Sequence, residues 1–292
     1  MAKIVVTGAN GFIGKNLIVR IKASTTHDVV PITRDIGDIA EPETWQSIPA
    51  SDVVIHLAAK TFVPDSWVAP SEFLATNLNG TVNALEFCRR HQSRLIYLSS
   101  YLYINPKTLP ITEQMDIGAS NPYMLSKKMA EDLCHFYAQY YEIPTTIFRP
   151  FNIIGVGQDE KFLIPSIIKQ ACENGVVHVK DTEPRRDYLH IDDLVSALLC
   201  AVDVSRKFDV FNIASGVSYS VQEVIDVVAS ILGESVAVVS EENRRLNEIM
   251  DTRADISKAK DLLGWQPSLT FPDALQLIVE DHRNHISVSC VS

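Results

Sequence analysis

The stretch KIVVTGANGFIG, residues 3–14, decides the fold. Its apolar run KIVVT suits a buried parallel strand, and the apolar spacing in GKNLIVRIKA, residues 14–23, predicts a helix directly afterwards. Between the two, glycines stand at positions 8, 11 and 14 in the spacing G-x-x-G-x-x-G. A strand, a glycine-rich turn and a helix in this order are typical of a dinucleotide-binding site, although the turn alone also fits an unrelated α/β protein.

The three glycines of this turn have separate physical tasks. We expect Gly8 to permit the tight turn, Gly11 to let the backbone approach a pyrophosphate, and Gly14 to let the helix pack closely on the sheet. The first N–H groups of the helix, at the positive end of its dipole, then face the phosphates. The turn therefore predicts a nucleotide cofactor bound near the start of the chain.

Strand and helix patterns alternate along the first half of the chain. Apolar runs predict strands at 28–33, 51–59, 94–100 and 145–150. Longer segments have helical spacing at 72–91 and 124–141. This alternation predicts an α/β fold with a Rossmann-type, doubly wound parallel sheet.

After residue 150 the pattern becomes mostly helical, with one return to the sheet. We expect a dinucleotide-binding domain over residues 1–150, joined by a return segment at about 186–214. Residues 151–185 and 215–292 are expected to form a smaller, mostly helical C-terminal lobe that binds the substrate.

Composition and charge argue against several classes of protein. The 292 residues are 46% hydrophobic and 21% charged, which is ordinary for a globular protein. The net charge of −10 argues against a general nucleic-acid binder. The five cysteines form no CxxC pair and no cluster with histidine, so neither a metal site nor a disulfide framework is predicted. No signal peptide and no apolar segment of transmembrane length is visible, so we expect a cytoplasmic protein with no membrane partner.

Two further stretches carry groups suited to proton transfer. In NPYMLSKK, Tyr123 and Lys127 are four residues apart, so a helix places both on one face. A phenol with an ordinary pKa of ~10 carries protons poorly at neutral pH, but a neighbouring ammonium group favours the phenolate. YLSSYLY ends a predicted strand with Ser99 and Ser100, and such a hydroxyl can hold a reacting oxygen near the tyrosine. Taken singly, the two stretches also fit a surface Tyr–Lys pair and simple strand capping.

Together and in this order, these motifs resemble those of the extended short-chain dehydrogenase/reductase family of nucleotide-sugar epimerases, dehydratases and reductases. The resemblance runs over about residues 3–283, in TGANGFIG, VIHLAA, NLNGTVNALEFC, LSSYLY, NPYMLSK, RPFNIIGVGQ, RRDYLHIDDL and ADISKAKDLLGWQP. It implies a catalytic Ser–Tyr–Lys triad. Aligning SSYLY on the family's S-S-x-x-Y pattern puts the hydroxyl at Ser99, with Ser100 as the second choice. Tyr123 would then be the acid/base, while Lys127 would hold the nicotinamide ribose and lower the tyrosine pKa.

The resemblance also implies which residues bind the cofactor and the substrate. Arg186 and Arg245 match arginines that meet a nucleotide diphosphate, which guanidinium groups bind bidentately, with the adjacent Arg185 and Arg244 as alternatives. The expected substrate contacts are Ser99, Ser100, Asn152, Arg186 and Arg245. The expected cofactor contacts are Gly8, Asn10, Gly11, Phe12, Ile13, Gly14, Thr33, Arg34, Asp38, Ile39, Leu57, Ala58, Ala59, Tyr123 and Lys127.

The motifs narrow the reaction to two main alternatives. The family's dehydratases carry an Asp–Glu pair directly after the strand-end hydroxyl, where Ser100 and Tyr101 stand if Ser99 is that hydroxyl. Neither side chain replaces a carboxylic acid and base. A reductase that acts at C4 of a nucleotide-diphospho-4-keto-6-deoxy sugar and a 4-epimerase with bound NAD remain. A non-catalytic, dinucleotide-sensing member of the fold is a further alternative, although such proteins typically lack the Tyr or the Lys.

The stretch PITRDIGD, residues 31–38, favours the reductase. The acid that binds the adenosine ribose lies about 20 residues beyond the glycine loop, where this chain has Thr33 and Arg34. An arginine accommodates the 2′-phosphate of NADP(H), which a carboxylate repels. NADP(H) is therefore favoured, with NAD(H) as the alternative if Asp35 binds the ribose. Asp38 matches an adenine-contacting acid of the family or is a plain turn cap.

Two expectations concern partners. RPFNIIGVGQ is similar to the R-x-F-N-H-x-G-P-x-Q of the family's GDP-sugar reductases, with Ile153 and Val156 in place of His and Pro. The substrate is therefore expected to be a nucleotide-diphosphate sugar. Family members often dimerise through two long helices, here about 72–91 and 122–141, so we also expect a homodimer.

Overall fold

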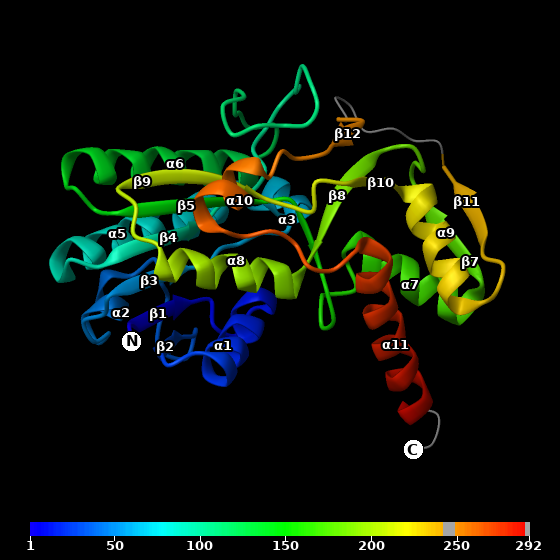
Figure 1. Cartoon of the computed structure of the whole chain (residues 1–292), viewed down its shortest axis with the longest axis horizontal. Coiled ribbons are helices and arrows are strands. Elements are labelled where there is room, and N and C mark those ends of the chain that lie inside the picture. The colour runs from blue at the N-terminus through cyan, green and yellow to red at the C-terminus, as the bar shows by residue number, and fades with distance from the viewer. Residues whose placement is uncertain (242–248, 290–292) are drawn as a thin grey trace.

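The computed structural model describes residues 1–241 and 249–289, and its centre is a six-stranded parallel sheet (Figure 1). The strand order is β2-β1-β3-β4-β5-β9, and every neighbouring pair is parallel. The chain leaves β1 toward β2 on one side and resumes with β3 on the other, so the prediction of a doubly wound Rossmann-type sheet is confirmed. The strands are β1 (Lys3–Thr7), β2 (Asp28–Ile32), β3 (Val53–His56), β4 (Arg94–Leu98), β5 (Thr145–Pro150) and β9 (Phe208–Ile213).

Helices cover both faces of this sheet, because successive side chains of each strand point to opposite faces (Figure 1). Ile4 and Val6 of β1 belong to one buried cluster, whereas Val5 belongs to the other. The first cluster lies under α1 (Phe12–Ser24), α8 (Ile191–Asp203) and α10 (Ser257–Leu263). The second lies under α2 (Pro42–Gln46), α5 (Gly80–His91) and α6 (Pro122–Tyr140). The helices α3 (Val63–Val68), α4 (Pro70–Leu74) and the π-helix η1 (Ala75–Asn79) lead into α5.

The C-terminal lobe is built around its own hydrophobic cluster and contains short strands as well as helices (Figure 1). Its helices are α7 (Leu163–Asn174), α9 (Val221–Leu232) and α11 (Phe271–Ser289). Its strands are β6 (Asn152–Ile154), β7 (Val176–Val179), β8 (Arg185–His190), β10 (Ser218–Ser220), β11 (Ala237–Ser240) and β12 (Asp251–Thr252). Within the segment 186–214, α8 and β9 return to the central layers, whereas β8 pairs with β6, β10 and β12.

A buried ion pair fixes α6 to the central sheet. Arg149 of β5 bonds Glu131 of α6 through Nε and Nη2, at 3.0 and 2.6 Å, and both side chains are buried. The same guanidinium donates to the Tyr103 hydroxyl at 3.0 Å, and that hydroxyl donates to Asn212 of β9 at 2.6 Å. The consecutive elements α6 and β5 thus share one hydrogen-bond network with Tyr103 and the distant β9, and this network holds the helix that carries the predicted Tyr–Lys pair.

Candidate active site

The glycine turn joins β1 to α1 at the carboxyl edge of the sheet. Gly8 has φ +69°, and a Cβ there would lie 2.9 Å from the Ala58 nitrogen. A Cβ at Gly14 would lie 2.2 Å from the Gly8 carbonyl oxygen, so both positions require glycine, as predicted. Gly11 is exposed and caps α1 without a side-chain hydrogen bond, so the helix N-terminus is open toward a phosphate. A dinucleotide fits this backbone cradle, because side chains at the glycine positions would otherwise fill the space.

The turn that follows β3 lies against the glycine turn. Its Leu57 and Ala58 N–H groups both donate to the Thr7 hydroxyl at 3.1 Å. Leu57, Ala58 and Ala59 are half-buried, and so are Phe12 and Ile13, while Asn10 is exposed. These predicted cofactor contacts are therefore gathered at one edge of the sheet.

The residues after β2 have mixed surroundings. Arg34 is exposed, and the Thr33 hydroxyl donates to Asp35 at 3.4 Å. Asp38 accepts the Ala40 N–H at 2.9 Å, which is the turn-capping arrangement. The Ile39 side chain is buried against Gly80, where an added Cβ would lie 2.5 Å from it. This side chain therefore belongs to the core, and only the Ile39 backbone is left for a cofactor contact.

Tyr123 and Lys127 occupy the first two turns of α6, as their spacing predicts. The helix starts there because Asn121 caps it, its side chain accepting the Met124 N–H at 2.8 Å. Lys127 is 3% exposed, and its Nζ donates to the Leu98 carbonyl at 2.7 Å. Burial lowers the pKa of Lys127 to about 8. Tyr123 is half-buried, and burial raises its pKa to about 12 against the opposing hydrogen bond with Ser100.

The two strand-end serines have different surroundings. The Ser99 N–H continues the pairing of β4 with β5, and its hydroxyl is buried without a hydrogen-bond partner among the described residues. Ser100, the first residue beyond that ladder, is the one that hydrogen-bonds Tyr123. Adjacent side chains of an extended segment point to opposite sides, so the expected hydroxyl of Ser99 and that of the second choice, Ser100, have different surroundings at this strand end. Whichever serine is the hydroxyl, the two residues that follow it supply no carboxylate of the kind that a dehydratase needs.

Asn77 is a site residue that the sequence reasoning missed. It is buried on the π-helix, where its side chain accepts the Lys60 N–H at 2.9 Å and donates to the Lys60 carbonyl at 3.1 Å. It also donates to the Ser126 hydroxyl at 2.8 Å, and that hydroxyl donates to the Tyr123 carbonyl at 2.7 Å. Asn77 therefore ties the turn after β3 to the helix of the Tyr–Lys pair. The stretch NLNGT was visible in the sequence, but its contact partners were not.

The predicted substrate residues lie on paired strands of the C-terminal lobe. Asn152 of β6 stands opposite Tyr188 of β8 and donates to the Asp187 carbonyl at 3.1 Å. Arg186 donates to the Ile249 carbonyl at 2.9 Å, whereas Arg185 forms an ion pair with Glu223 at 2.9 Å. Two residues apart on β8, Arg186 and Tyr188 share a face, so Arg186 and Asn152 lie on one side of this small sheet. The predicted contact Arg245 lies outside the described residues.

One aromatic contact joins the two lobes. Phe62, in the segment after β3, meets Phe162 before α7 edge to face, with ring centroids 5.9 Å apart. The Lys161 ammonium lies 4.7 Å from the Phe62 centroid. Phe162 ends the segment 155–162. At the start of that segment, a Cβ at Gly155 would lie 3.3 Å from the Phe12 ring. Residues 155–162 therefore run from the first residue of α1 to the segment after β3.

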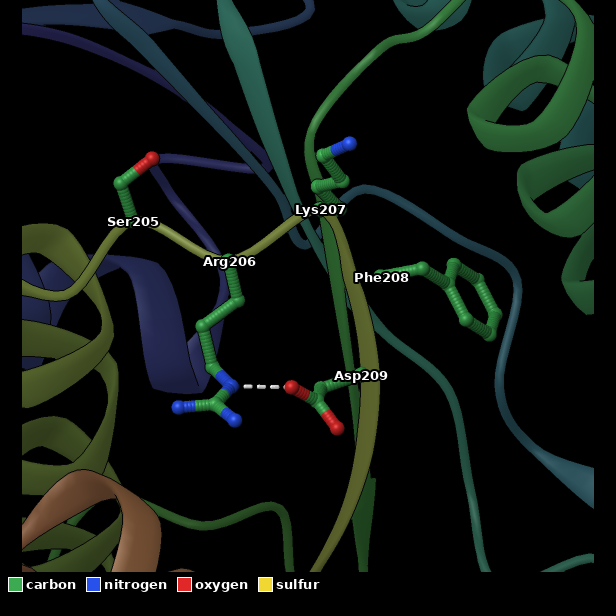
Figure 2. A pocket seen from close by; sticks show the side chains of 5 residues that line it. All are labelled: Ser205, Arg206, Lys207, Phe208 and Asp209. Atoms are coloured by element: carbon green, nitrogen blue, oxygen red, sulfur yellow. Dashed lines mark hydrogen bonds and ion pairs between the residues drawn. The ribbon is translucent and has the colours of Figure 1, made fainter.

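The larger of the two cavities described lies elsewhere. Its volume is about 420 Å³, and it is lined by Ser205, Arg206, Lys207, Phe208 and Asp209, whose side chains are drawn in Figure 2. It lies at the amino end of β5 and β9, since the Thr145 N–H donates to the Lys207 carbonyl, and is therefore opposite the glycine turn. Arg206 turns toward Asp209 and forms an ion pair with it (Figure 2). The cavity therefore takes no part in the arrangement of site residues.

Two kinds of feature are absent from residues 1–241 and 249–289. No helix there combines the length and the apolar character needed to cross a membrane. No group of three or more His, Cys, Asp or Glu side chains there is placed to hold a metal ion.

The glycine cradle and the Ser–Tyr–Lys grouping define a nucleotide-dependent dehydrogenase or epimerase fold. Residues 4–214 match the model of the NAD dependent epimerase/dehydratase family, so the chain belongs to this family. It is an extended short-chain dehydrogenase/reductase, an NAD(P)-dependent enzyme of the nucleotide-sugar oxidoreductase and epimerase type.

Its relatives include both reductases and epimerases. The chain is 31% identical to the GDP-6-deoxy-D-mannose reductase of Pseudomonas aeruginosa over 301 residues, covering 97% of this chain and 98% of that protein. The structure of RMD from Pseudomonas aeruginosa complexed with NADPH is 30% identical, with a TM-score of 0.90 over 98% of this chain and 100% of the other. A UDP-glucose 4-epimerase from Thermotoga maritima, with UDP-glucose, is 26% identical, with a TM-score of 0.88 over 97% and 99%.

Proposed function

We propose that this enzyme reduces a nucleotide-diphospho-4-keto-6-deoxy sugar at C4, with NADPH as its reductant. The observation that carries the choice is Arg34, exposed just beyond β2 where a ribose-binding carboxylate is usual. The 31% identity to a GDP-6-deoxy-D-mannose reductase and the likeness to a structure complexed with NADPH support the same choice. A GDP-sugar is accordingly the preferred substrate class.

The site residues have complementary tasks in this reaction. NADPH, when bound, supplies the hydride that reaches the C4 carbonyl carbon. Ser100 donates a hydrogen bond to the carbonyl oxygen, and Tyr123 gives that oxygen a proton as its negative charge develops. The raised pKa of Tyr123, about 12, keeps the phenol protonated at neutral pH, which suits an acid. Lys127 holds the nicotinamide ribose and stabilises the phenolate that remains.

The C-terminal lobe supplies the recognition of the substrate in this proposal. Arg186 and Arg245 bind the diphosphate bidentately, and Asn152 binds the sugar from the neighbouring strand. Glycines 8, 11 and 14 hold the pyrophosphate of the cofactor against the helix N-terminus.

The cytoplasmic location stays a prediction, which fractionation of the producing cell tests.

We also propose a homodimer formed through α6. Leu125, Met129, Phe136 and Tyr140 are between 40% and 64% exposed and lie at helical spacing on one face. A contiguous apolar stripe on a helix is typical of a protein interface. Sedimentation of the wild type and of Met129→Glu tests this, and a monomer in both would contradict it.

Cofactor titration is the experiment that tests the reductase. We expect NADPH to bind at least ~10-fold more tightly than NADH, and Arg34→Ala to remove that difference. Arg20→Ala, which removes an exposed cation of α1 away from the glycine turn, is the control and should preserve the preference. Wild-type enzyme should also oxidise NADPH when given a GDP-4-keto-6-deoxy sugar. Purification with bound NAD, indifference to NADPH and interconversion of UDP-sugar 4-epimers would replace the reductase by the epimerase. Binding without turnover of either substrate class would favour a non-catalytic member.

A further inference from the structure

His56, the last residue of β3, lies between Thr7, which precedes the glycine turn, and Tyr97, whose ring borders Lys127. It is 1% exposed, and its Nδ1 lies 2.8 Å from the Thr7 hydroxyl, directly before the glycine turn. On its other side the ring stacks with Tyr97, with centroids 6.0 Å apart. The Lys127 ammonium lies 4.8 Å from the centroid of that same tyrosine ring. One imidazole therefore lies between the glycine turn and the lysine of the triad.

The proton on the Thr7 hydroxyl has one possible destination. A hydroxyl has two lone pairs and one hydrogen, and the Leu57 and Ala58 amides can only donate to it. With both lone pairs in use, the hydrogen points to His56 Nδ1, which must be the acceptor. His56 is therefore the neutral tautomer protonated on Nε2. Burial, with a smaller contribution from Lys127, lowers its pKa to about 3 and agrees with the neutral ring.

This hydrogen bond affects how closely the turn after β3 lies against the glycine turn. The Ala58 nitrogen held by Thr7 is the atom that a Cβ at Gly8 would approach to 2.9 Å, so the two turns are in close contact. If the acceptor on His56 is removed, the Thr7 hydrogen loses its partner and the hydroxyl is free to rotate. The two amides then lose an acceptor of fixed orientation.

We propose that His56 is a positioning residue of the dinucleotide site. By accepting the Thr7 hydrogen, it orients that hydroxyl to hold the turn after β3 against the glycine turn. The proposal rests on dinucleotide binding at this edge of the sheet, and it is independent of the choice between reductase and epimerase. The competing explanation is packing alone, since His56 also borders Trp45 with ring centroids 6.3 Å apart.

Five variants separate positioning from packing. His56→Leu and Thr7→Val remove the acceptor and the donor at nearly constant volume, while His56→Asn and Thr7→Ser retain them. Phe87→Leu is the control, because Phe87 is buried and packs at a tilt against Trp45, which also borders His56, and because it forms no hydrogen bond with Thr7. For each variant we would measure the dissociation constant of NADPH or NADH, whichever the wild type binds more tightly, and the thermal midpoint.

We expect His56→Leu and Thr7→Val each to weaken dinucleotide binding ~10-fold, as for the loss of a buried hydrogen bond. His56→Asn and Thr7→Ser should stay within ~3-fold of wild type, since an acceptor and a hydroxyl remain. The double variant His56→Leu/Thr7→Val should bind the dinucleotide about as tightly as whichever single variant binds it less tightly. The reason is that each substitution removes the same Thr7–His56 hydrogen bond. Phe87→Leu should lower the thermal midpoint and leave binding unchanged.

Three results would overturn the proposal. Binding by His56→Leu within ~2-fold of wild type would reduce His56 to packing. Equal loss in His56→Asn and His56→Leu would show that the acceptor is not what matters, and additive losses in the double variant would separate His56 from Thr7. If His56→Leu does not fold, the contrast between Thr7→Val and Thr7→Ser, with His56→Asn, decides the question on its own. A reductase assignment that failed would leave all of these binding ratios measurable.

Discussion

The edge of the central sheet and the C-terminal lobe hold their site residues in different ways. At the sheet edge, Lys127, Asn77 and His56 are buried, and each has defined partners that lie far away in the sequence. In the C-terminal lobe, Asn152 and Arg186 are half-buried on short strands. A rigid edge preserves the chemistry, while a less buried lobe can change its substrate without disturbing it.

The largest effect should come from removing the acid at the rigid edge. Tyr123→Phe deletes only the hydroxyl, so turnover should fall by ~10²–10⁴-fold, while dinucleotide affinity stays nearly unchanged. Steady-state rates and a cofactor titration on the same preparation test both parts. Tyr141→Phe, which deletes the same hydroxyl at an exposed position at the end of the same helix, is the control and should keep full activity. Normal turnover by Tyr123→Phe would remove the tyrosine from the mechanism.

The stability of the edge should depend on the buried pair behind it. Glu131→Gln leaves the Arg149 guanidinium buried without its counter-charge, and breaking such a pair costs about 3–5 kcal/mol of unfolding free energy. Asp132→Asn, the adjacent residue of α6, breaks only the exposed ion pair with Lys128 and should change stability little. Urea unfolding of both variants measures the contrast. Equal losses would mean that burial does not distinguish the two pairs.

The two strand-end serines, Ser99 and Ser100, should differ in their effect on turnover. Ser100→Ala should lower turnover ~10²-fold, as for the loss of one donor to a developing oxyanion, because Ser100 is the hydroxyl beside Tyr123. Ser99→Ala removes a buried hydroxyl that has no partner among the described residues, so it should be nearly silent in turnover. Rates at saturating substrate compare the two directly. The reverse ranking would assign the reacting hydroxyl to Ser99, as the alignment predicts.

The choice between the two serines shows how much the sequence alone can predict. The glycine spacing, the alternation of strands with helices and the four-residue Tyr–Lys spacing are local patterns, and the fold follows from them. The choice between Ser99 and Ser100 depends on where the ladder between β4 and β5 ends, which no local pattern specifies. Asn77 meets Ser126 across 49 residues, and that contact exists only in the folded chain. The pairing of β8 with β6, β10 and β12 is likewise non-local.

The pH dependence should report Lys127. Its pKa is lowered to about 8 by burial, so the ammonium form is present below that pH and is lost as the pH rises through it. We expect the turnover rate to be steady near neutrality and to fall by up to ~10-fold per pH unit above about 8. Lys127→Arg keeps its charge and should move that decline to higher pH. A rate that stays level to pH 10 in the wild type would contradict a required ammonium group.

The smallest effect is expected from a substitution in the C-terminal lobe, which should lower the affinity for the substrate. Arg186→Ala should raise the KM for the nucleotide sugar ~10-fold with kcat nearly unchanged, since a diphosphate contact far from C4 contributes to binding more than to chemistry. Arg185→Ala is the matched control on the adjacent residue. Its guanidinium is engaged by Glu223 and by the Ser218 carbonyl, on the other face of β8 from Asn152, so the KM should change less.

A larger change in KM for Arg185→Ala would exchange the roles of the two arginines and reverse the face assigned to the substrate. A fall in kcat for Arg186→Ala, at constant KM, would be more informative still. It would mean that the lobe acts on the transition state. The separation between a rigid edge that performs the chemistry and a lobe that only binds would then be wrong.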